Sequence, residues 1–197
     1  MRIEAVSIVV CNYDGAVHLP HCLDALAALR GPVVEVLLVD NASTDDSVAL
    51  VAERFPSVRI VHAGSNEGPA RARNLGMREA RSRWVLAVDN DAVLAPDALE
   101  RLIAAAEADE SAVIVQPRSV FDDEPARVHY DGGSFHYAGL IALRNFYRPL
   151  AEAEVEPDGR GTRRVDCAVS VALLVDRDVV LAAGGYDERY FILFEDL

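Results

Sequence analysis

Lysine is absent from this chain: its 197 residues include 19 basic side chains, and all of them are arginine. This absence excludes mechanisms that need a lysine amine, namely a Schiff base, a P-loop phosphate lysine or a lysine general base. The sequence also lacks a G-x-S-x-G turn, which disfavours a serine hydrolase. No G-x-G-x-x-G follows the first expected strand, which disfavours a Rossmann dinucleotide site.

Cysteine and long apolar runs are also scarce. The three cysteines, at positions 11, 22 and 167, form no C-x-x-C pair, so neither a disulfide framework nor a cysteine zinc site is predicted. No apolar run reaches the roughly 18 residues that a membrane span needs, and the N-terminus becomes polar too early for a secretory signal. We therefore expect a cytoplasmic protein with no transmembrane segment in this chain.

Charge of one sign dominates the composition. With 32 acidic residues, the net charge is −13. Broad nucleic-acid binding needs a basic surface that displaces counterions, so no nucleic-acid partner is expected. Apolar residues make up 51% of the chain, which is enough for a real core and argues against disorder along the whole chain.

Strands and helices alternate along the first 115 residues. Apolar and β-branched runs predict strands at Val6–Val10, Val33–Val39, Val58–Val61, Trp84–Val88 and Ala112–Val115. Helical spacing with proline and polar caps predicts helices at Leu19–Leu29, Val48–Arg54 (capped from within Asn41–Thr44), Gly68–Ala80 and Pro96–Ala108. This alternation predicts an α/β fold with a mostly parallel central sheet flanked by helices.

The rest of the chain has a weaker pattern. Residues 121–164 are rich in glycine, arginine, tyrosine and acidic residues, and we expect an irregular excursion there. Val165–Val175 is strand-like, Asp176–Ala183 predicts a short helix, and Gly184–Tyr186 predicts a turn. We expect one domain over residues 1–197, with halves at 1–117 and 118–197, the second incomplete at its C-terminal end.

Polar clusters follow three of the expected strands, at Asn12–Asp14, Asp40–Thr44 and Asp89–Asp91. In parallel sheets, ligands bind at the carboxyl ends of the strands, where these clusters are expected to lie. The two carboxylates of Asp89–Asp91 suit a hard divalent cation, which takes oxygen ligands and keeps sites for phosphate oxygens. A solvated loop that caps a helix is the alternative. Asp40 is equally open to binding a base or ribose and to capping the helix that follows.

Arginine is concentrated between residues 71 and 83. Five arginines, opposed within the segment by Glu79 alone, predict a local positive island; they are residues 71, 73, 78, 81 and 83. A diphosphate would be attracted to this island and to the helix N-terminus near Gly68. Arg71 and Arg73 are the better ligand candidates, and the other three are expected on the surface.

An acidic pair, Glu195-Asp196, follows an aromatic run near the end of the chain. A carboxylate beside apolar rings could have a raised pKa and act as a general base. The alternative is an acidic pair exposed to solvent.

Taken together, the motifs resemble the inverting nucleotide-sugar glycosyltransferases of family 2, which have the Rossmann-like GT-A fold. Five segments match in order: VSIVVCNYD at 6–14, VDNASTDDS at 39–47, NEGPARARN at 66–74, DND at 89–91, and GGYDE at 184–188 leading to Glu195-Asp196. Asp14 stands where the family often has asparagine.

The resemblance implies a role for each segment. The first half, 1–117, would bind the nucleotide sugar, and the second, 118–197, would serve the acceptor. The implied nucleotide-sugar-binding residues are Cys11, Asn12, Tyr13, Asp40, Asn66, Gly68, Arg71, Arg73, Asp89 and Asn90. Within this set, Cys11 and Tyr13 would contact the base, and Asp40 would bind the uracil or thymine ring.

The resemblance also implies the chemistry. Asp89 would reach the ribose, and Asp91, with Asp89, would hold Mn²⁺ or Mg²⁺ on the diphosphate. Asp196 would be the general base, with Glu195 beside it. A sugar would move with inversion from a nucleoside-diphosphate donor, UDP- or dTDP-linked, to a hydroxyl of a glycan, lipid-linked or small-molecule acceptor. We expect a role in cell-surface polysaccharide or glycan synthesis, compatible with peripheral association at the inner face of the membrane.

Two other functions stay open at this point. One is a nucleotide-sugar-binding module without catalysis, because the acceptor half is incomplete. The other is a nucleotidyltransferase, which would usually show a glycine-rich phosphate loop near the N-terminus, often with a basic residue. Residues 12–17 offer neither feature.

Overall fold

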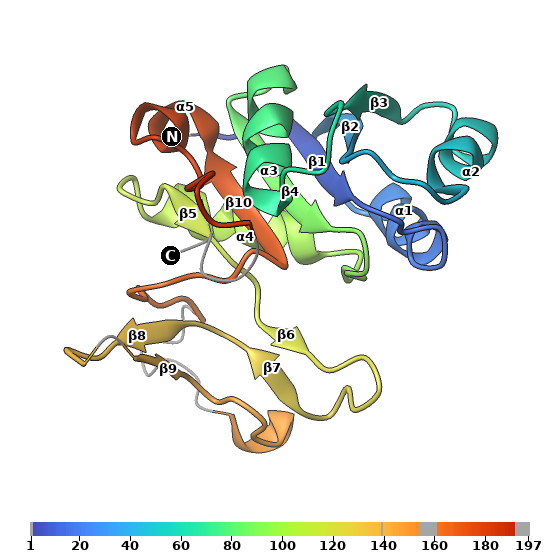
Figure 1. Cartoon of the computed structure of the whole chain (residues 1–197). Helices are drawn as coiled ribbons and strands as arrows, with labels where there is room; N and C mark the ends of the chain where they lie inside the picture. Colours follow the sequence, from blue (N-terminus) through green and yellow to red (C-terminus); the bar gives the residue numbers. More distant parts are fainter. Residues whose placement is uncertain (1, 139, 154–160, 192–197) are drawn as a thin grey trace. The chain divides into compact units, whose positions relative to one another are not determined.

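The computed structural model describes residues 2–138, 140–153 and 161–191, and Figure 1 labels its helices and strands. The described chain forms two compact units. The first contains the residues up to Val115 and those from Ser170 onward, and the second contains Gln116–Val169. The chain therefore leaves the first unit after Val115 and returns to it at Ser170. The expectation of a single domain stays a prediction.

A six-stranded sheet forms the centre of the first unit, in the order β3-β2-β1-β4-β10-β5. Its strands are β1 (Val6–Asn12), β2 (Val33–Asp40), β3 (Arg59–His62), β4 (Trp84–Asp89), β5 (Ile114–Val115) and β10 (Ala172–Asp176). The first four in chain order are parallel, whereas β10 runs antiparallel to its neighbours β4 and β5. The prediction of an α/β fold with a mostly parallel sheet is confirmed.

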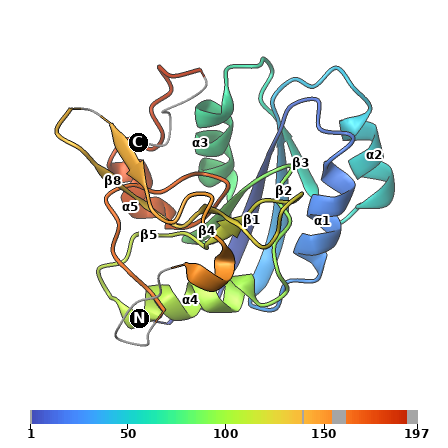
Figure 2. The same cartoon turned by 90° about the horizontal axis from the view of Figure 1, so that it is seen from below.

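Helices cover both faces of this sheet. They are α1 (Leu19–Ala27), α2 (Ser47–Arg54), α3 (Pro69–Glu79), α4 (Ala98–Ala108) and α5 (Arg177–Ala182). Alternate residues of β1, namely Val6, Ile8 and Val10, pack with α1, α2 and α4 in the main core. Because successive side chains of a strand point to opposite faces, Val9 lies on the other face, where α3 packs against β1 and β2. Figure 2 shows the sheet between α3 and α1.

Three predicted boundaries in this unit are wrong in a way that bears on the site. Asn12 and Asp89 are the last residues of β1 and β4, not loop residues, whereas β2 ends at Asp40 as predicted. Helix α2 takes no side-chain cap from residues 41–44; its N-cap position is Asp46, and the Asp45 carboxylate accepts a hydrogen bond from the Ser47 N–H at 3.0 Å. The polar groups of residues 41–44 are instead used between loops, as described below.

The second unit contains two small antiparallel sheets, β6–β7 and β8–β9. Their strands have two or three residues each: Ser119–Val120, Val128–Tyr130, Gly133–Phe135 and Ile141–Leu143. A short 3-10 helix follows at Leu150–Glu152. The expectation of a wholly irregular 121–164 is therefore wrong in part, because strands this short leave no period in the sequence. The expected strand at Val165–Val175 is confirmed only over β10.

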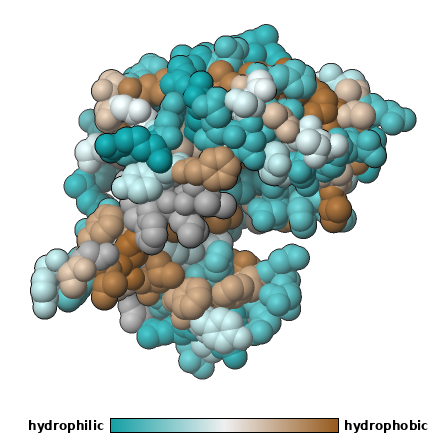
Figure 3. All heavy atoms as spheres, viewed as in Figure 1, coloured by the Kyte–Doolittle hydropathy of each residue, from teal (hydrophilic) through white to brown (hydrophobic). Residues whose placement is uncertain are grey.

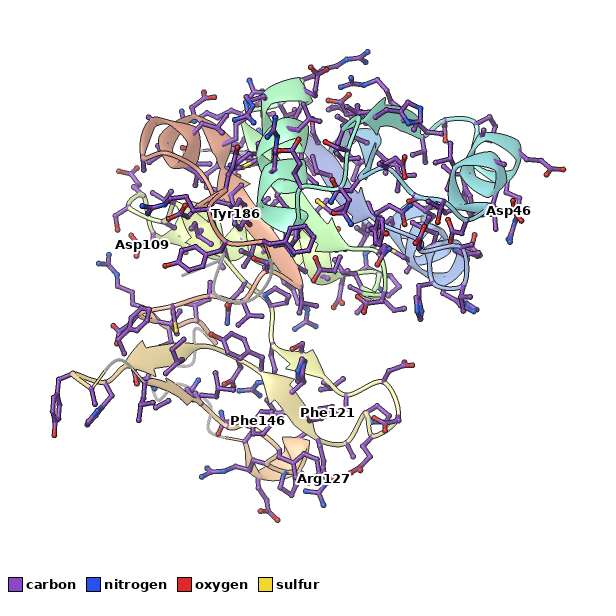
Figure 4. All side chains as sticks on the ribbon, viewed as in Figure 1. Asp46, Asp109, Phe121, Arg127, Phe146 and Tyr186 are labelled. Carbon is purple, nitrogen blue, oxygen red and sulfur yellow. The ribbon has the colours of Figure 1, made fainter. Side chains whose placement is uncertain are left out.

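Aromatic rings hold one part of this unit together. Phe121 lies 4.8 Å from His129 and 6.1 Å from Phe146, measured between ring centroids, and Figure 4 labels both phenylalanines. On the face drawn in Figure 3, apolar side chains gather over the region of β8 and β9, where Phe135 and Leu140 are exposed. No helix in the described part of the chain is long and apolar enough to cross a membrane.

Candidate active site

The ends of three neighbouring strands bring the predicted polar clusters to one edge of the sheet. Asn12 is in register with Asp40 of β2, and the adjacent Cys11 is in register with Asp89 of β4. These three strands are parallel, so their carboxyl ends open on the same side. The register therefore places Asp40 and Asp89 at the same edge of the sheet, as the sequence predicts. This edge, formed by the ends of β1, β2 and β4 and the loops that follow them, is the rim of the site.

The side chain of Asn12 connects the loops that follow these strands. It is 1% exposed. Its Nδ2 donates to the hydroxyls of Ser43 and Ser47, both at 3.0 Å, and its Oδ1 accepts from Asn90 Nδ2 at 2.8 Å. Asn12 and Asn90, both predicted to contact the donor, thus use their amides to hold the rim in shape, which makes them supports of the site.

Asp14 supports the same rim from outside, a role that the sequence reading missed. Its Oδ1 accepts a hydrogen bond from the Thr44 N–H at 2.7 Å, and its own N–H donates to Ser43 Oγ at 3.0 Å. Its φ of 48° lies in the left-handed region, which aspartate tolerates better than most residues. The signal in the sequence is Asp14-Gly15 after a strand, a pair typical of a turn.

Gly15 lies directly over the Asn12–Asn90 hydrogen bond, and this gives a first prediction. A Cβ there would come within 2.2 Å of both Asn12 Oδ1 and Asn90 Nδ2. We expect Gly15→Ala to break that bond and lower the free energy of unfolding by about 1–3 kcal/mol. Urea unfolding measures the change. Gly64→Ala is a control with open space around the Cβ, although its φ of 80° adds some backbone strain; equal losses in both variants would contradict the prediction.

A buried ion pair ties helix α3 to the end of β4. Arg73 NH2 lies 2.7 Å from Asp89 Oδ1, and the Arg73 side chain is 5% exposed. Its guanidinium also lies 5.4 Å from the centre of the Tyr186 ring. Burial alone would lower the pKa of Arg73, but the charges of Asp89, Cys11 and Tyr186 and the hydrogen bond to Asp89 together outweigh burial and raise that pKa. Arg73, a predicted ligand residue, therefore holds Asp89 in place at the rim.

The other arginines of the predicted positive island are also paired. Arg78 pairs with Glu188 at 3.3 Å, Arg81 with Glu35 at 3.5 Å, and Arg83 with Asp176 at 2.6 Å. Arg71 pairs with Glu67 one turn before it. The expectation of an uncompensated positive island is wrong, because its counter-charges lie outside residues 71–83, from Glu67 nearby to Glu35, Asp176 and Glu188 far away in sequence. The expectation that Arg78, Arg81 and Arg83 lie on the surface is confirmed.

Asp40 and the loop before α3 complete the rim. Asp40 Oδ1 accepts from the Ser43 N–H at 3.3 Å, and Oδ2 lies 3.4 Å from His62 Nδ1. The Asn41 amide, buried and missed by the sequence reading, donates to Asn66 Oδ1 at 2.8 Å and to the Gly68 carbonyl at 3.2 Å. Asp40 thus caps the turn that follows β2 rather than helix α2. Through Asn41, the loop after β2 is hydrogen-bonded to Asn66 and Gly68.

Cys11 and Tyr13, expected to contact the base, differ in exposure. Burial raises the pKa of the Cys11 thiol to about 12, so it is a neutral group at physiological pH and unsuited to nucleophilic work. The Tyr13 side chain is 49% exposed and available to a ligand. Asp196, the predicted general base, and its neighbour Glu195 lie outside the described residues.

Asp91 is the carboxylate that suits a cation. It is exposed, and among the described residues it makes no hydrogen bond or ion pair. No group of three or more histidine, cysteine, aspartate or glutamate side chains in the described ranges could cage a metal ion. Mg²⁺ is usually held by one or two carboxylates plus substrate phosphates. The residues therefore fit a cation that binds together with a diphosphate, and they do not form a preformed metal cage.

Comparison with known proteins agrees with this architecture. The family model described as glycosyl transferase family 2 matches residues 7–167. The chain belongs to this family. Its fold resembles that of Staphylococcus aureus TarS 1-349, with a TM-score of 0.63, 18% identity and coverage of 100% of this chain and 53% of that one. The family 2 chain therefore has the expected GT-A architecture.

Two curated relatives show how far the family likeness extends. The succinoglycan biosynthesis protein ExoO of Rhizobium meliloti is 38% identical over 54% of this chain and 31% of the relative. The N-acetylglucosaminyl-diphospho-decaprenol L-rhamnosyltransferase of Mycobacterium tuberculosis is 27% identical over 98% of this chain and 68% of the relative. This family 2 chain spans about a third of the first relative and about two thirds of the second.

Proposed function

We propose that this chain binds a nucleoside-diphosphate sugar and transfers its sugar, with inversion, to an acceptor hydroxyl. The observation that carries the proposal is the rim itself: Asp40 and Asp89 end the two strands that flank β1, and Asp91 follows β4 with a carboxylate that makes no hydrogen bond or ion pair among the described residues. Family membership supports the reaction class. A solved mannosyltransferase from Pyrobaculum calidifontis, in complex with GDP-Man and Mn²⁺, shares the fold with a TM-score of 0.61 and 20% identity.

The donor would lie across the strand ends. The exposed Tyr13 ring offers a surface for the base, and Asp40 can accept a hydrogen bond from a uracil or thymine N–H. Asp89, held by Arg73, would face the ribose, and Asn12 and Asn90 keep the loops in position. Fixed polar groups of this kind cost no reorganisation when the donor reacts.

Asp91 would hold the divalent cation, Mn²⁺ or Mg²⁺, against the diphosphate. The cation would neutralise the charge that develops on the departing nucleoside diphosphate. Asp196, with Glu195 beside it, would accept the proton of the acceptor hydroxyl on the opposite face of the sugar. The bond from C1 to the diphosphate oxygen breaks as the bond from C1 to the acceptor oxygen forms, so one displacement inverts the anomeric centre.

The relatives suggest a class of acceptor. One is named for succinoglycan biosynthesis and the other acts on a diphospho-decaprenol carrier. We therefore propose a glycan or lipid-linked acceptor in cell-surface polysaccharide synthesis, with the chain in the cytoplasm and in peripheral contact with the membrane. A UDP- or dTDP-linked donor is the leading choice because Asp40 suits the N–H of a pyrimidine ring.

A thermal-shift screen with UDP-, dTDP- and GDP-sugars, with and without Mn²⁺, tests the proposal. A matching donor at about 100 times its Kd stabilises the fold by about 2.7 kcal/mol, which is a rise of several degrees in Tm. We expect this rise to need both the nucleotide and Mn²⁺, and the same donor to release its nucleotide when an acceptor is added. The absence of a shift with every donor would refute the proposal. Binding without turnover would indicate a non-catalytic binding module.

A further inference from the structure

The segment that follows α5 is fastened along helix α3 by one buried side chain. Asn74 Oδ1 accepts from the Tyr186 N–H at 2.9 Å, and Asn74 Nδ2 donates to the Tyr186 carbonyl at 2.9 Å. The same Nδ2 donates to Glu188 Oε1 at 2.8 Å. Asn74 is 1% exposed. One amide therefore binds both backbone groups of Tyr186, as a neighbouring strand would, and a carboxylate two residues further on.

Other contacts on the same helix hold the same segment. Arg78 NH2 donates to Glu188 Oε1 at 3.3 Å, and the Arg73 guanidinium lies over the Tyr186 ring. At the start of α3, a Cβ on Gly68 would come within 2.3 Å of the Phe191 carbonyl oxygen, so that backbone lies directly against the helix. Figure 4 shows Tyr186 beside α3. Residues 186–191 are thus attached at both ends of one helix.

The sequence of the segment suits this attachment. Gly185 has φ of 74°, and a Cβ there would lie 2.4 Å from Asn74 Oδ1. A side chain at position 185 would therefore strain the backbone and displace the Asn74 amide. The Gly-Gly-Tyr turn predicted from the sequence is thus shaped to receive Asn74.

We propose that Asn74, with Glu188, is a positioning residue for transfer: it holds residues 186–191, the described segment that precedes the proposed general base in the sequence. This inference rests on the proposed function, because the base is Asp196. A general base must lie within hydrogen-bond reach, about 3 Å between heavy atoms, of the hydroxyl whose proton it removes. A displacement of about 1 Å in such a group can cost about a hundredfold in rate. Among the described residues, the side chain of Asn74 hydrogen-bonds Tyr186 and Glu188 and not Asp40, Asp89 or Asp91, so its effect should fall on turnover rather than on donor affinity.

Asn74→Asp is the sharpest test because it keeps the size of the side chain. The new carboxylate can still accept from the Tyr186 N–H, but it cannot donate to the Tyr186 carbonyl and it repels Glu188. We expect kcat for transfer to fall about tenfold or more, with the donor Kd changed less than about twofold. Adding Glu188→Gln removes the repulsion and supplies a new donor to position 74, so it should recover part of the lost kcat.

A matched control separates positioning from general destabilisation. Val51→Ala opens a cavity in the main core on the opposite face of the sheet and should leave kcat unchanged at temperatures well below its Tm. Hydrogen exchange at residues 185–191 should rise in Asn74→Asp and not in Val51→Ala. If Asn74→Asp does not fold, the exposed Glu188→Ala carries the same test, with a smaller expected loss of kcat.

The outcomes are distinct. A wild-type kcat in Asn74→Asp together with raised exchange at residues 185–191 would overturn the inference. The hydrogen bonds of Asn74 to Tyr186 and Glu188 would then have a structural role only. An equal loss of donor affinity would also overturn it. A wild-type chain that binds no donor and transfers no sugar would instead count against the proposed function.

Discussion

Asp91→Ala is expected to lower metal-dependent sugar transfer by about a thousandfold, because a cation that stabilises a leaving diphosphate contributes several kcal/mol to the transition state. The side chain is exposed and makes no hydrogen bond or ion pair within the described residues, so its removal should cost the fold little. The donor's affinity should lose its dependence on Mn²⁺. Isothermal titration with the donor at several Mn²⁺ concentrations measures this directly.

The control for this variant is Asp24→Ala. Asp24 is an exposed carboxylate on α1 whose nearest cation, Arg54, is 4.0 Å away. Removing it changes the net charge by the same amount as Asp91→Ala does, and should leave Mn²⁺-dependent binding intact. If Asp91→Ala bound the donor with an unchanged Mn²⁺ dependence, the cation would have to be held elsewhere and its assignment to Asp91 would fail.

The sheet could be predicted from the sequence because its strands are buried on both faces and read as continuous apolar runs. Val6–Val10 and Trp84–Val88 are examples, and both are confirmed within one or two residues. The apolar runs predict that β2 ends at Asp40, but they could not show that Asn12 and Asp89 complete β1 and β4. The backbone of such a residue still hydrogen-bonds to the neighbouring strand, but its side chain is polar and faces the rim. A pattern of apolar residues therefore ends before the strand does.

The electrostatics of the site were harder to predict, since they depend on contacts between distant segments. The arginines of α3 and the residues after it look unopposed in the sequence, yet Glu35, Asp176 and Glu188 neutralise three of them from elsewhere in the chain. Asn74 lies inside a recognised segment, but nothing local shows that its partner is Tyr186, which is 112 residues away. Side-chain pairing at that separation follows from the fold and leaves no pattern in either segment.

Arg73→Met is expected to have the largest effect on stability among the variants of this site. The Arg73 side chain is 5% exposed, whereas that of Asp89 is 30% exposed. Removing the cation leaves the Asp89 carboxylate partly buried without the partner that holds it at 2.7 Å. Loss of one member of such a pair costs about 2–5 kcal/mol, and methionine fills most of the vacated volume, so little of that cost should come from a cavity. Urea unfolding at neutral pH measures the loss.

A second substitution identifies the origin of that cost. If the penalty comes from the carboxylate that has lost Arg73, Asp89→Asn in the Arg73→Met background should recover part of the lost stability, with a coupling energy of about 1 kcal/mol or more between the two positions. Additive effects would contradict this, and would assign the role of Arg73 to its packing against Tyr186. The double variant should bind donor poorly, because Asp89→Asn removes the carboxylate that is proposed to face the ribose. The stability and the binding function of this ion pair are therefore separable, and the same pair of proteins measures both.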